Sequence, residues 1–203
     1  MNSLRLTVFD IFSYMVPGVC YLIMVPWALK WVAPFQFIDS FSNLTIYSTV
    51  AYAFLAYLIG FISDSIAIVI VLFITDRIRG DHRARVLAEF MKENTETEIT
   101  DYHFSTIYSF VDIKAPNARE KADMFSAMSG LARNLSLAFL LLSILILCTA
   151  VVEFQNGYLV HEFAASACSF VVSCVLMLRA DTFRKWSHSH LLNSFSLLGG
   201  GRP

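Results

Sequence analysis

The sequence predicts an all-α integral membrane protein with four transmembrane helices, and two observations support that prediction. The first is composition: the chain of 203 residues is 57% hydrophobic and only 15% charged. The second is that four long uncharged stretches are bounded by charge, at residues 11–29, 40–63 with an apolar continuation to 75, 134–152 and 163–178. A bilayer core is about 30 Å thick and takes roughly 20 apolar helical residues to cross. The remaining residues leave room for a modest extra-membrane element, but not for a separate catalytic domain of ordinary size.

The first stretch begins after Arg5 and contains the pair Pro17-Gly18, with Pro26 near its end. Its length and the lack of a convincing small-residue cleavage site argue against a secretory signal. Proline removes a backbone hydrogen bond and bends a membrane helix, and neighbouring groups or water then satisfy the freed carbonyls. We interpret the prolines as a kink in a retained helix rather than as a hinge or a cavity.

The second and fourth stretches carry small residues at intervals of three or four, which let helix backbones approach closely. These residues are Ala53, Ala56, Gly60, Ser63 and Ala67 in the second, and Ala165, Ser169 and Ser173 in the fourth. Packing within one four-helix unit and contact between subunits both fit the pattern. We expect a homo-oligomer in which one row is internal and the other lies between subunits.

Asp64 follows Gly60 by one turn and stands out as an ionisable residue within an apolar stretch. Ionisable groups inside membranes mark ion paths, proton relays or contacts between helices. Because the second stretch is longer than one span needs, the helix can also place Asp64 near an interface. We favour a structural pair with Arg133, or with a Tyr or Ser hydroxyl, over ion conduction, and include Asp64 among the oligomer-packing residues.

Between the second and third stretches, residues 76–130 form the only sizeable polar segment. Val86, Leu87, Phe90 and Met91 have helical spacing, which predicts that the second span continues as an amphipathic helix to Asn94. Phe104, Ile107, Tyr108 and Val111 predict a second short helix. Pro116 ends it, and the pair Asn117 and Glu120 predicts the start of a helix that can run unbroken into the third span.

Basic residues predict the orientation, because Lys and Arg accumulate in cytoplasmic loops and short flanks. Arg77, Arg79, Arg83 and Arg85 follow the second stretch, and Arg133 precedes the third. Arg179, Arg184 and Lys185 follow the fourth. Both termini are therefore expected in the cytoplasm. The chain then divides into a first transmembrane hairpin (1–75), a cytoplasmic helical loop (76–130), a second transmembrane hairpin (131–178) and a cytoplasmic tail (179–203).

Aromatic side chains in the loop and tail are candidate anchors for a soluble cytoplasmic effector protein. A small polar segment cannot bury all of its rings, and exposed rings commonly anchor protein partners. The candidates are Phe104, Tyr108, Phe110 and Trp186, with Tyr102 and His103 beside them. Tyr108 and Phe104 can instead pack on a neighbouring helix.

Signals of catalysis or cofactor binding are missing. The sequence has no glycine-rich phosphate loop, nucleophile elbow or paired catalytic carboxylates, and its five histidines show no metal-ligand spacing. The four cysteines fall inside the apolar stretches, where thiols act as small hydrophobes. A net charge of -1 gives no reason to expect nucleic-acid binding. We expect a non-enzymatic protein without cofactor or metal, whose immediate environment is membrane lipid.

Several short features together resemble a family of small four-helix bacterial membrane proteins found among antiviral defence genes, such as the membrane subunit of the Kiwa system. They are Phe9-Asp10 followed by Tyr14 and Pro17-Gly18, the run from Tyr57 to Gly60, and the tail Phe183-Arg184-Lys185-Trp186. The resemblance implies an oligomeric protein of the bacterial inner membrane that recruits a soluble effector and responds to phage contact with the envelope. The resemblance assigns no functional role to any individual residue of this chain.

The leading hypothesis is therefore a non-enzymatic membrane sensor and scaffold of an anti-phage defence complex. The alternative is a small homo-oligomeric ion channel or pore with Asp64 near its lumen. A third, weaker hypothesis is a membrane-embedded enzyme or a lipid-handling protein.

Overall fold

A computed structural model describes residues 8–29, 46–93, 104–152 and 159–198 of the chain. Over these residues the protein is all-α, as the sequence predicts, and contains no strand. The helices are α1 (Val8–Leu29), α2 (Ile46–Arg79), α3 (His82–Glu93), α4 (Phe104–Lys114), α5 (Pro116–Val152) and α6 (Leu159–Leu197).

Three helices are long and apolar enough to cross a membrane, namely α2, α5 and α6. The apolar part of α1, Ile11–Met24, is shorter. These lengths and compositions indicate a membrane-embedded protein. The fourth span and the orientation stay predictions.

The α5 and α6 helices are much longer than a membrane span. They contain 37 and 39 residues, which at 1.5 Å per residue makes each about 55–60 Å long, nearly twice a bilayer core. The helix that begins at Pro116 runs unbroken through the third apolar stretch, as the sequence suggests. The fourth apolar stretch likewise continues as helix far into the expected tail, to Leu197.

The expected continuation of the second span to Asn94 is wrong. The α2 helix ends at Arg79, and α3 begins separately at His82. Gly80 between them has a φ of +79°, the left-handed conformation that ends helices and that glycine adopts without steric cost. The Gly80 N–H donates to the carbonyl of Asp76 at 2.9 Å, which closes the last turn of α2.

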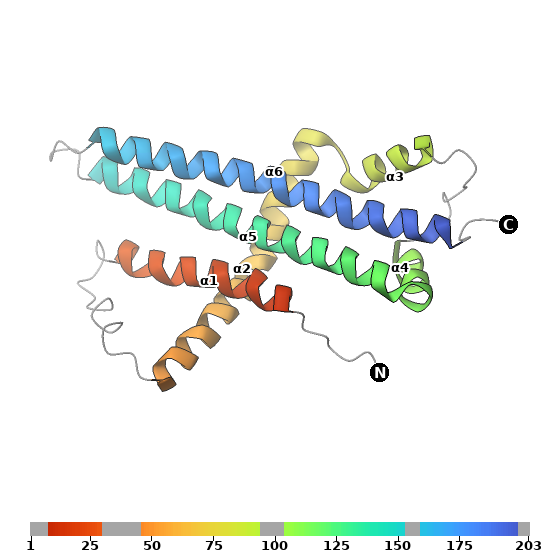
Figure 1. Cartoon of the computed structure of the whole chain (residues 1–203). Helices are drawn as coiled ribbons and strands as arrows, with labels where there is room; N and C mark the ends of the chain where they lie inside the picture. Colours follow the sequence, from red (N-terminus) through yellow and green to blue (C-terminus); the bar gives the residue numbers. More distant parts are fainter. Residues whose placement is uncertain (1–7, 30–45, 94–103, 153–158, 199–203) are drawn as a thin grey trace.

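The α5 and α6 helices run side by side and antiparallel along their whole length (Figure 1). Small residues face each other at every seventh position of both helices, the spacing that keeps one seam between two helices. The pairs are Ala122 with Ser187, Ser129 with Ala180, Ser136 with Ser173, and Ser143 with Ser166. We call this row of pairs the serine seam.

Serine hydroxyls in the seam donate to backbone carbonyls of the opposite helix. Ser136 and Ser173 do so reciprocally at 2.9 and 2.8 Å, and Ser143 and Ser166 at 3.0 and 2.9 Å. Lipid tails are as apolar as leucine, so close packing of small residues and hydrogen bonds replace the hydrophobic effect as the force between such helices.

The α1 and α2 helices cross at two glycines. A Cβ atom on Gly18 would lie 1.7 Å from the carbonyl oxygen of Ala56, and one on Gly60 would lie 1.8 Å from that of Tyr14. Any side chain at either position would collide with backbone, so this crossing requires glycine.

A proline in α1 creates the contact with α5. Pro17 lacks the N–H that would bond the carbonyl of Ser13, four residues earlier. The Nδ2 atom of Asn134, on α5, donates to that carbonyl at 3.3 Å. Asn134 is completely buried, so the proline kink expected from the sequence also serves as a docking point for the third apolar helix.

The α2 helix crosses the α5–α6 pair steeply instead of running beside it (Figure 1). Its early part packs on α1 and its later part reaches α5 and α6, where the turn into α3 begins. A long apolar helix can be accommodated in a bilayer by tilting. The arrangement places α3 and α4 at the same end of the α5–α6 pair.

Candidate functional site

The end of the molecule that carries α3 and α4 is a compact helical domain with its own core. We define the helical domain as α3, α4, the first four turns of α5 and the last five turns of α6. Its buried core comprises Val86, Phe90, Ile107, Val111, Ala122, Leu191, Leu192 and Phe195. Residues from all four elements contribute, so the expected loop and tail fold together as one unit.

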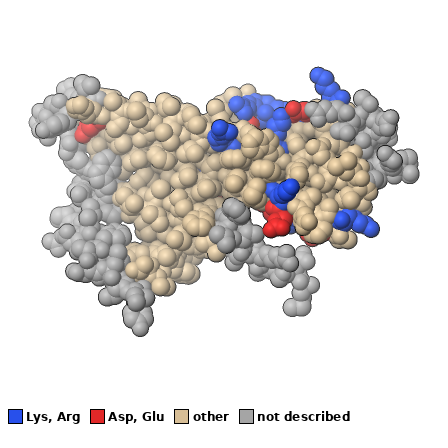
Figure 2. Space-filling view, viewed as in Figure 1, with Lys and Arg blue, Asp and Glu red and all other residues tan. Residues whose placement is uncertain are grey.

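Charge separates this domain from the rest of the molecule. In Figure 2 the visible Lys, Arg, Asp and Glu side chains gather over the helical domain and its junction with α2. On the face seen in this view, the described surface of the opposite half is almost free of them. Large exposed side chains there are apolar, such as Phe54, Ile62 and Val171, which are 64%, 62% and 59% exposed. An apolar band beside a charged end is the surface expected of a membrane protein with one polar domain.

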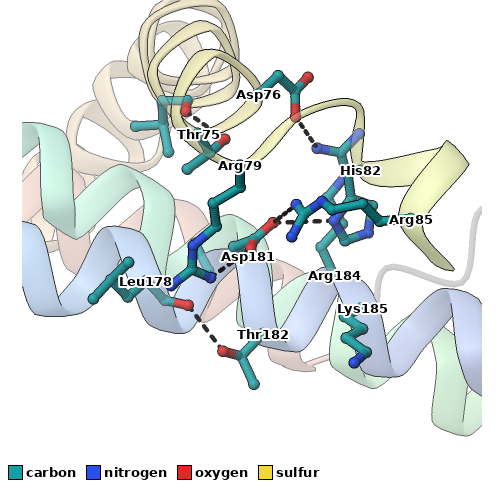
Figure 3. Close-up of polar contacts among 12 residues, drawn as sticks. Thr75, Asp76, Arg79, His82, Arg85, Leu178, Asp181, Thr182, Arg184 and Lys185 are labelled. Atoms are coloured by element: carbon teal, nitrogen blue, oxygen red, sulfur yellow. Dashed lines mark hydrogen bonds and ion pairs between the residues drawn. The ribbon is translucent and has the colours of Figure 1, made fainter. Parts of the chain in front are cut away.

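At the junction, one carboxylate joins three helices. Asp181, on α6, is buried, and its Oδ2 accepts from the Arg79 guanidinium at 2.9 Å. Its Oδ1 lies 3.0 Å from Nδ1 of His82 and accepts from Arg85 at 3.4 Å. Figure 3 shows these side chains converging on Asp181 from the end of α2 and the start of α3. We call these four residues the Asp181 cluster.

His82 is the most buried member of the cluster, with 1% of its surface exposed. Its ring lies 5.2 Å from the ring of His188, measured between centroids. Burial lowers the pKa of His82 below its ordinary value, and the positive charge of Arg184 lowers it further. Asp181 opposes this shift but does not reverse it. His82 is therefore held mainly neutral at pH 7, with Nδ1–H available to donate to Asp181.

Two further ion pairs tie the same elements together. Arg184 lies 3.9 Å from the carboxylate of Asp76, which links α6 to α2. Lys185 lies 2.6 Å from Glu89, which links α6 to α3, but both side chains are about half exposed. Exposed pairs contribute little, so the Asp181 cluster is the main polar attachment of the α2–α3 turn to α6.

Asp64 pairs with Arg133, one of the partners that the sequence suggested. The two side chains meet at 2.6 Å between α2 and α5 and are only 13% and 15% exposed. The carboxylate is neutralised by a guanidinium of the same chain. This arrangement joins two helices and is the structural pair favoured from the sequence.

The other predicted packing residues fall into two groups. Ala56, Gly60 and Ser63 are buried, with Ala56 and Gly60 at the α1–α2 crossing of the same chain, and Ser173 belongs to the serine seam. Ala165 is exposed and Ser169 is half-buried. Among these small residues, only Ala165 and Ser169 offer surface to a second copy.

Two of the predicted docking rings are held inside the helical domain. The Tyr108 hydroxyl donates to the Asp123 carboxylate, and the Arg119 guanidinium carbon lies 3.5 Å from the centre of its ring. Burial, with the hydrogen bond to Asp123, raises the pKa of Tyr108 to about 12. Phe110 packs edge-on against Phe195 at 5.1 Å between centroids. These rings stabilise the domain.

The other predicted docking rings differ in what the structure describes. Phe104 begins α4, but its side chain lies outside the described residues, as do Tyr102 and His103. Trp186 remains 44% exposed and contacts Phe125 and Phe183 edge-on, at 5.6 and 5.5 Å between centroids.

An aromatic ledge, in which Trp186 is exposed and the other rings are half-buried, extends along α5 and α6. We define it as Phe125, Phe183, Trp186 and His190, whose rings contact one another in turn. The sequence pointed to the tail segment with Phe183 and Trp186 but missed Phe125, because a residue 61 positions away joins them only through the antiparallel pairing. His190 lies one turn after Trp186, a spacing that could have identified it.

A small cavity adjoins the Asp181 cluster, lined by Thr75, Ser129, Arg133, Asp181 and Arg184 with Val71 and Ala180. The space open to the centre of a water-sized sphere is about 10 Å³, which suits one water molecule and no organic substrate. Among the described residues, no group of three His, Cys, Asp or Glu side chains could hold a metal ion.

Comparison with protein-family models, with curated protein sequences and with solved structures finds no match to this chain.

Proposed function

We propose that this chain is a non-enzymatic membrane scaffold and sensor that assembles as a homo-oligomer in the bacterial inner membrane and presents its helical domain to a soluble cytoplasmic effector. One observation carries most of the proposal. The α5 and α6 helices continue without interruption from the apolar half into the helical domain, and the serine seam joins them in both parts. A displacement of these helices in the membrane would therefore also displace the helical domain.

The aromatic ledge is the surface we propose for the effector. Trp is the side chain most enriched at binding hot spots, because its large ring combines apolar area with an N–H donor. Trp186 is 44% exposed and is supported from below by Phe125 and Phe183. A ring held in place loses little entropy when a partner covers it.

Trp186→Ala tests this surface, with Ile113→Ala as its matched control. Ile113 is an exposed apolar side chain of the same domain, on α4 and outside the ledge. We expect Trp186→Ala to reduce, by at least tenfold, the effector that co-purifies with the protein from native membranes, while Ile113→Ala leaves it unchanged. Equal loss in both variants, or in neither, would contradict docking at the ledge.

The setting in antiviral defence is proposed from the resemblance alone. In a strain that carries the native gene and its neighbours, the scaffold hypothesis predicts that Trp186→Ala lowers protection against phage and that Ile113→Ala does not. Plaque counts relative to a deletion strain measure the difference. Unchanged protection after deletion of the whole gene would remove the defence role.

The pore alternative has less support, because it requires Asp64 to face a lumen. The Asp64 carboxylate instead lies against the Arg133 guanidinium between two helices of one chain. The geometry favours an attachment point over an ion path.

A further inference from the structure

Gly80 forms the turn between α2 and α3. Gly80 has a φ of +79°, and a Cβ placed on it would meet no atom within 4 Å. The α3 helix, which follows, is covered by α6 through Val86 and Phe90 in the core and through the Asp181 cluster. Release of the cluster would leave the 12-residue α3 attached mainly by a small apolar contact.

Charged groups surround His82 from three helices, and one neighbouring arginine belongs to a fourth. Burial disfavours a positive charge on the ring, and Arg184 and Arg85 disfavour it further, while Asp181 offsets these effects only in part. The fourth-helix arginine is itself paired with Asp64. The groups are Asp76 and Arg79 on α2, Asp81 and Arg85 on α3, and Asp181, Arg184 and His188 on α6, with Arg133 of α5 lining the adjacent cavity.

Only one nitrogen of His82 has a hydrogen-bond partner among the described residues. Nδ1 lies 3.0 Å from Asp181, whereas Nε2 is buried without one. Neutral histidine fits this arrangement, because Nδ1 carries the proton and Nε2 needs none. Protonated histidine would place an N–H at Nε2 without an acceptor and a charge among guanidinium groups, and both cost free energy in a buried site.

We propose that the Asp181 cluster is a proton-sensitive latch: it fastens the α2–α3 turn to α6 while His82 is neutral, and protonation of His82 releases α3. The signal is a fall in pH on the side of the membrane that holds the helical domain. Release would uncover the core positions of Val86 and Phe90. The latch does not depend on docking at the aromatic ledge.

The direction follows from proton binding. A histidine exposed by release takes up a proton near its ordinary pKa of about 6.5, whereas the pKa of latched His82 is lowered by burial and by Arg184. The released state binds more protons, so it gains population as the pH falls through this range. Arginine stays charged throughout, so the arginines do not titrate with it.

Distance measurement between spin labels tests the latch on the full chain in lipid nanodiscs. The four native cysteines are replaced by serine, and labels are attached after Ala88→Cys on α3 and Asn193→Cys on α6, both exposed positions. We expect one short distance at pH 7.5 and a longer population at pH 5.5. His82→Gln can still donate to Asp181 but does not titrate, so it should stay short at both values.

Three further variants sharpen the assignment. Asp181→Asn weakens the cluster for every partner and should give the longer distance even at pH 7.5. His161→Gln removes an exposed histidine of α6 outside the helical domain and should respond as the wild type does. An unchanged distance in the wild type between the two pH values would overturn the latch, and so would lengthening in His82→Gln. Loss of the response in His188→Gln, with its retention in His82→Gln, would assign the proton to His188 and contradict the proposal.

Discussion

At the scale of single residues, the polar groups of the apolar half serve attachment. Asn134 satisfies the carbonyl that Pro17 leaves free, and Arg133, its neighbour in the chain, neutralises Asp64. Two consecutive residues of α5 therefore fix α1 and α2 in place. Such contacts matter in a membrane because the bilayer core contains no water that could hydrogen-bond an unsatisfied polar group.

Replacement of Asn134 by alanine should destabilise the fold by about 1–3 kcal/mol, the usual cost of leaving a buried polar partner unsatisfied. Unfolding by SDS in mixed micelles measures the change. Asn193→Ala, at an exposed position of α6, is the control and should have no effect. Pro17→Ala restores an N–H for the Ser13 carbonyl, so we expect it to lessen the penalty of Asn134→Ala; additive penalties would show that the two residues are not coupled.

The Asp64–Arg133 pair should behave as a unit. Asp64→Asn or Arg133→Gln alone leaves one charge with little solvent, and we expect each to destabilise the protein by less than the roughly 3–5 kcal/mol found for fully buried pairs. The double variant removes both charges and should be more stable than the worse single variant. Conductance in planar bilayers provides the contrasting test, because a pore lined by Asp64 predicts changed ion selectivity in Asp64→Asn without loss of stability.

At the scale of helices, the length of apolar runs was enough to predict α2, α5 and α6, whereas their partners were not predictable from local spacing. Intervals of three and four single out Ala165, Ser169 and Ser173 on α6, but the contact with α5 uses intervals of seven. Only Ser173 is common to both patterns. The break at Gly80 was missed because the hydrophobic pattern continues across it, and only backbone conformation reveals it.

The partners of Asp181 were also beyond prediction from the sequence. In the chain it stands among Arg179, Arg184 and Lys185, where it reads as one acidic residue within a basic flank. Its role depends on Arg79 and His82, which approach only because α2 crosses α6 and α3 turns back at Gly80. Contacts set by crossing geometry between distant helices leave no periodic trace in the sequence.

A bulky side chain in the serine seam should separate α5 from α6. Ser173→Leu adds volume where the Ser136 and Ser173 hydroxyls each donate to the other residue's backbone carbonyl, at 2.9 and 2.8 Å, and overpacking of this kind costs about 1–3 kcal/mol. Ala165→Leu makes a comparable change on an exposed face of the same helix and should leave the monomer unaffected. Thermal unfolding followed by circular dichroism compares them, and equal melting temperatures would refute the seam as the main contact.

At the scale of the whole molecule, the apolar and charged halves predict a definite orientation. We expect the helical domain to lie in the cytoplasm, because the basic flanks gather there. In a cysteine-free background, Lys92→Cys on α3 and His161→Cys near the start of α6 probe opposite ends. A membrane-impermeant maleimide should label the second in intact cells with a permeabilised outer membrane and the first only after lysis. The reverse pattern would invert the topology.

The molecule also limits which surface can join two copies. The Gly60 face and Ser173 are used inside the chain, so the homo-oligomer that we propose must use another face. The small exposed surface at Ala165 and Ser169 on α6 remains, with exposed Cys168 between them. A close approach of two α6 helices there would bring the two Cys168 thiols near each other.

Oxidative crosslinking in native membranes tests this interface with the protein's own cysteines. Cys168 and Cys148 are both exposed, on α6 and α5 respectively, so Cys148 serves as the matched control. A variant that keeps only Cys168 should form a disulfide-linked dimer with copper phenanthroline, and one that keeps only Cys148 should form much less. Ala165→Leu should abolish the Cys168 dimer without changing thermal stability, because its added bulk lies outside the monomer's core. A protein that is monomeric by native mass spectrometry in mild detergent and gives no Cys168 dimer in membranes would remove the oligomer from the proposed function.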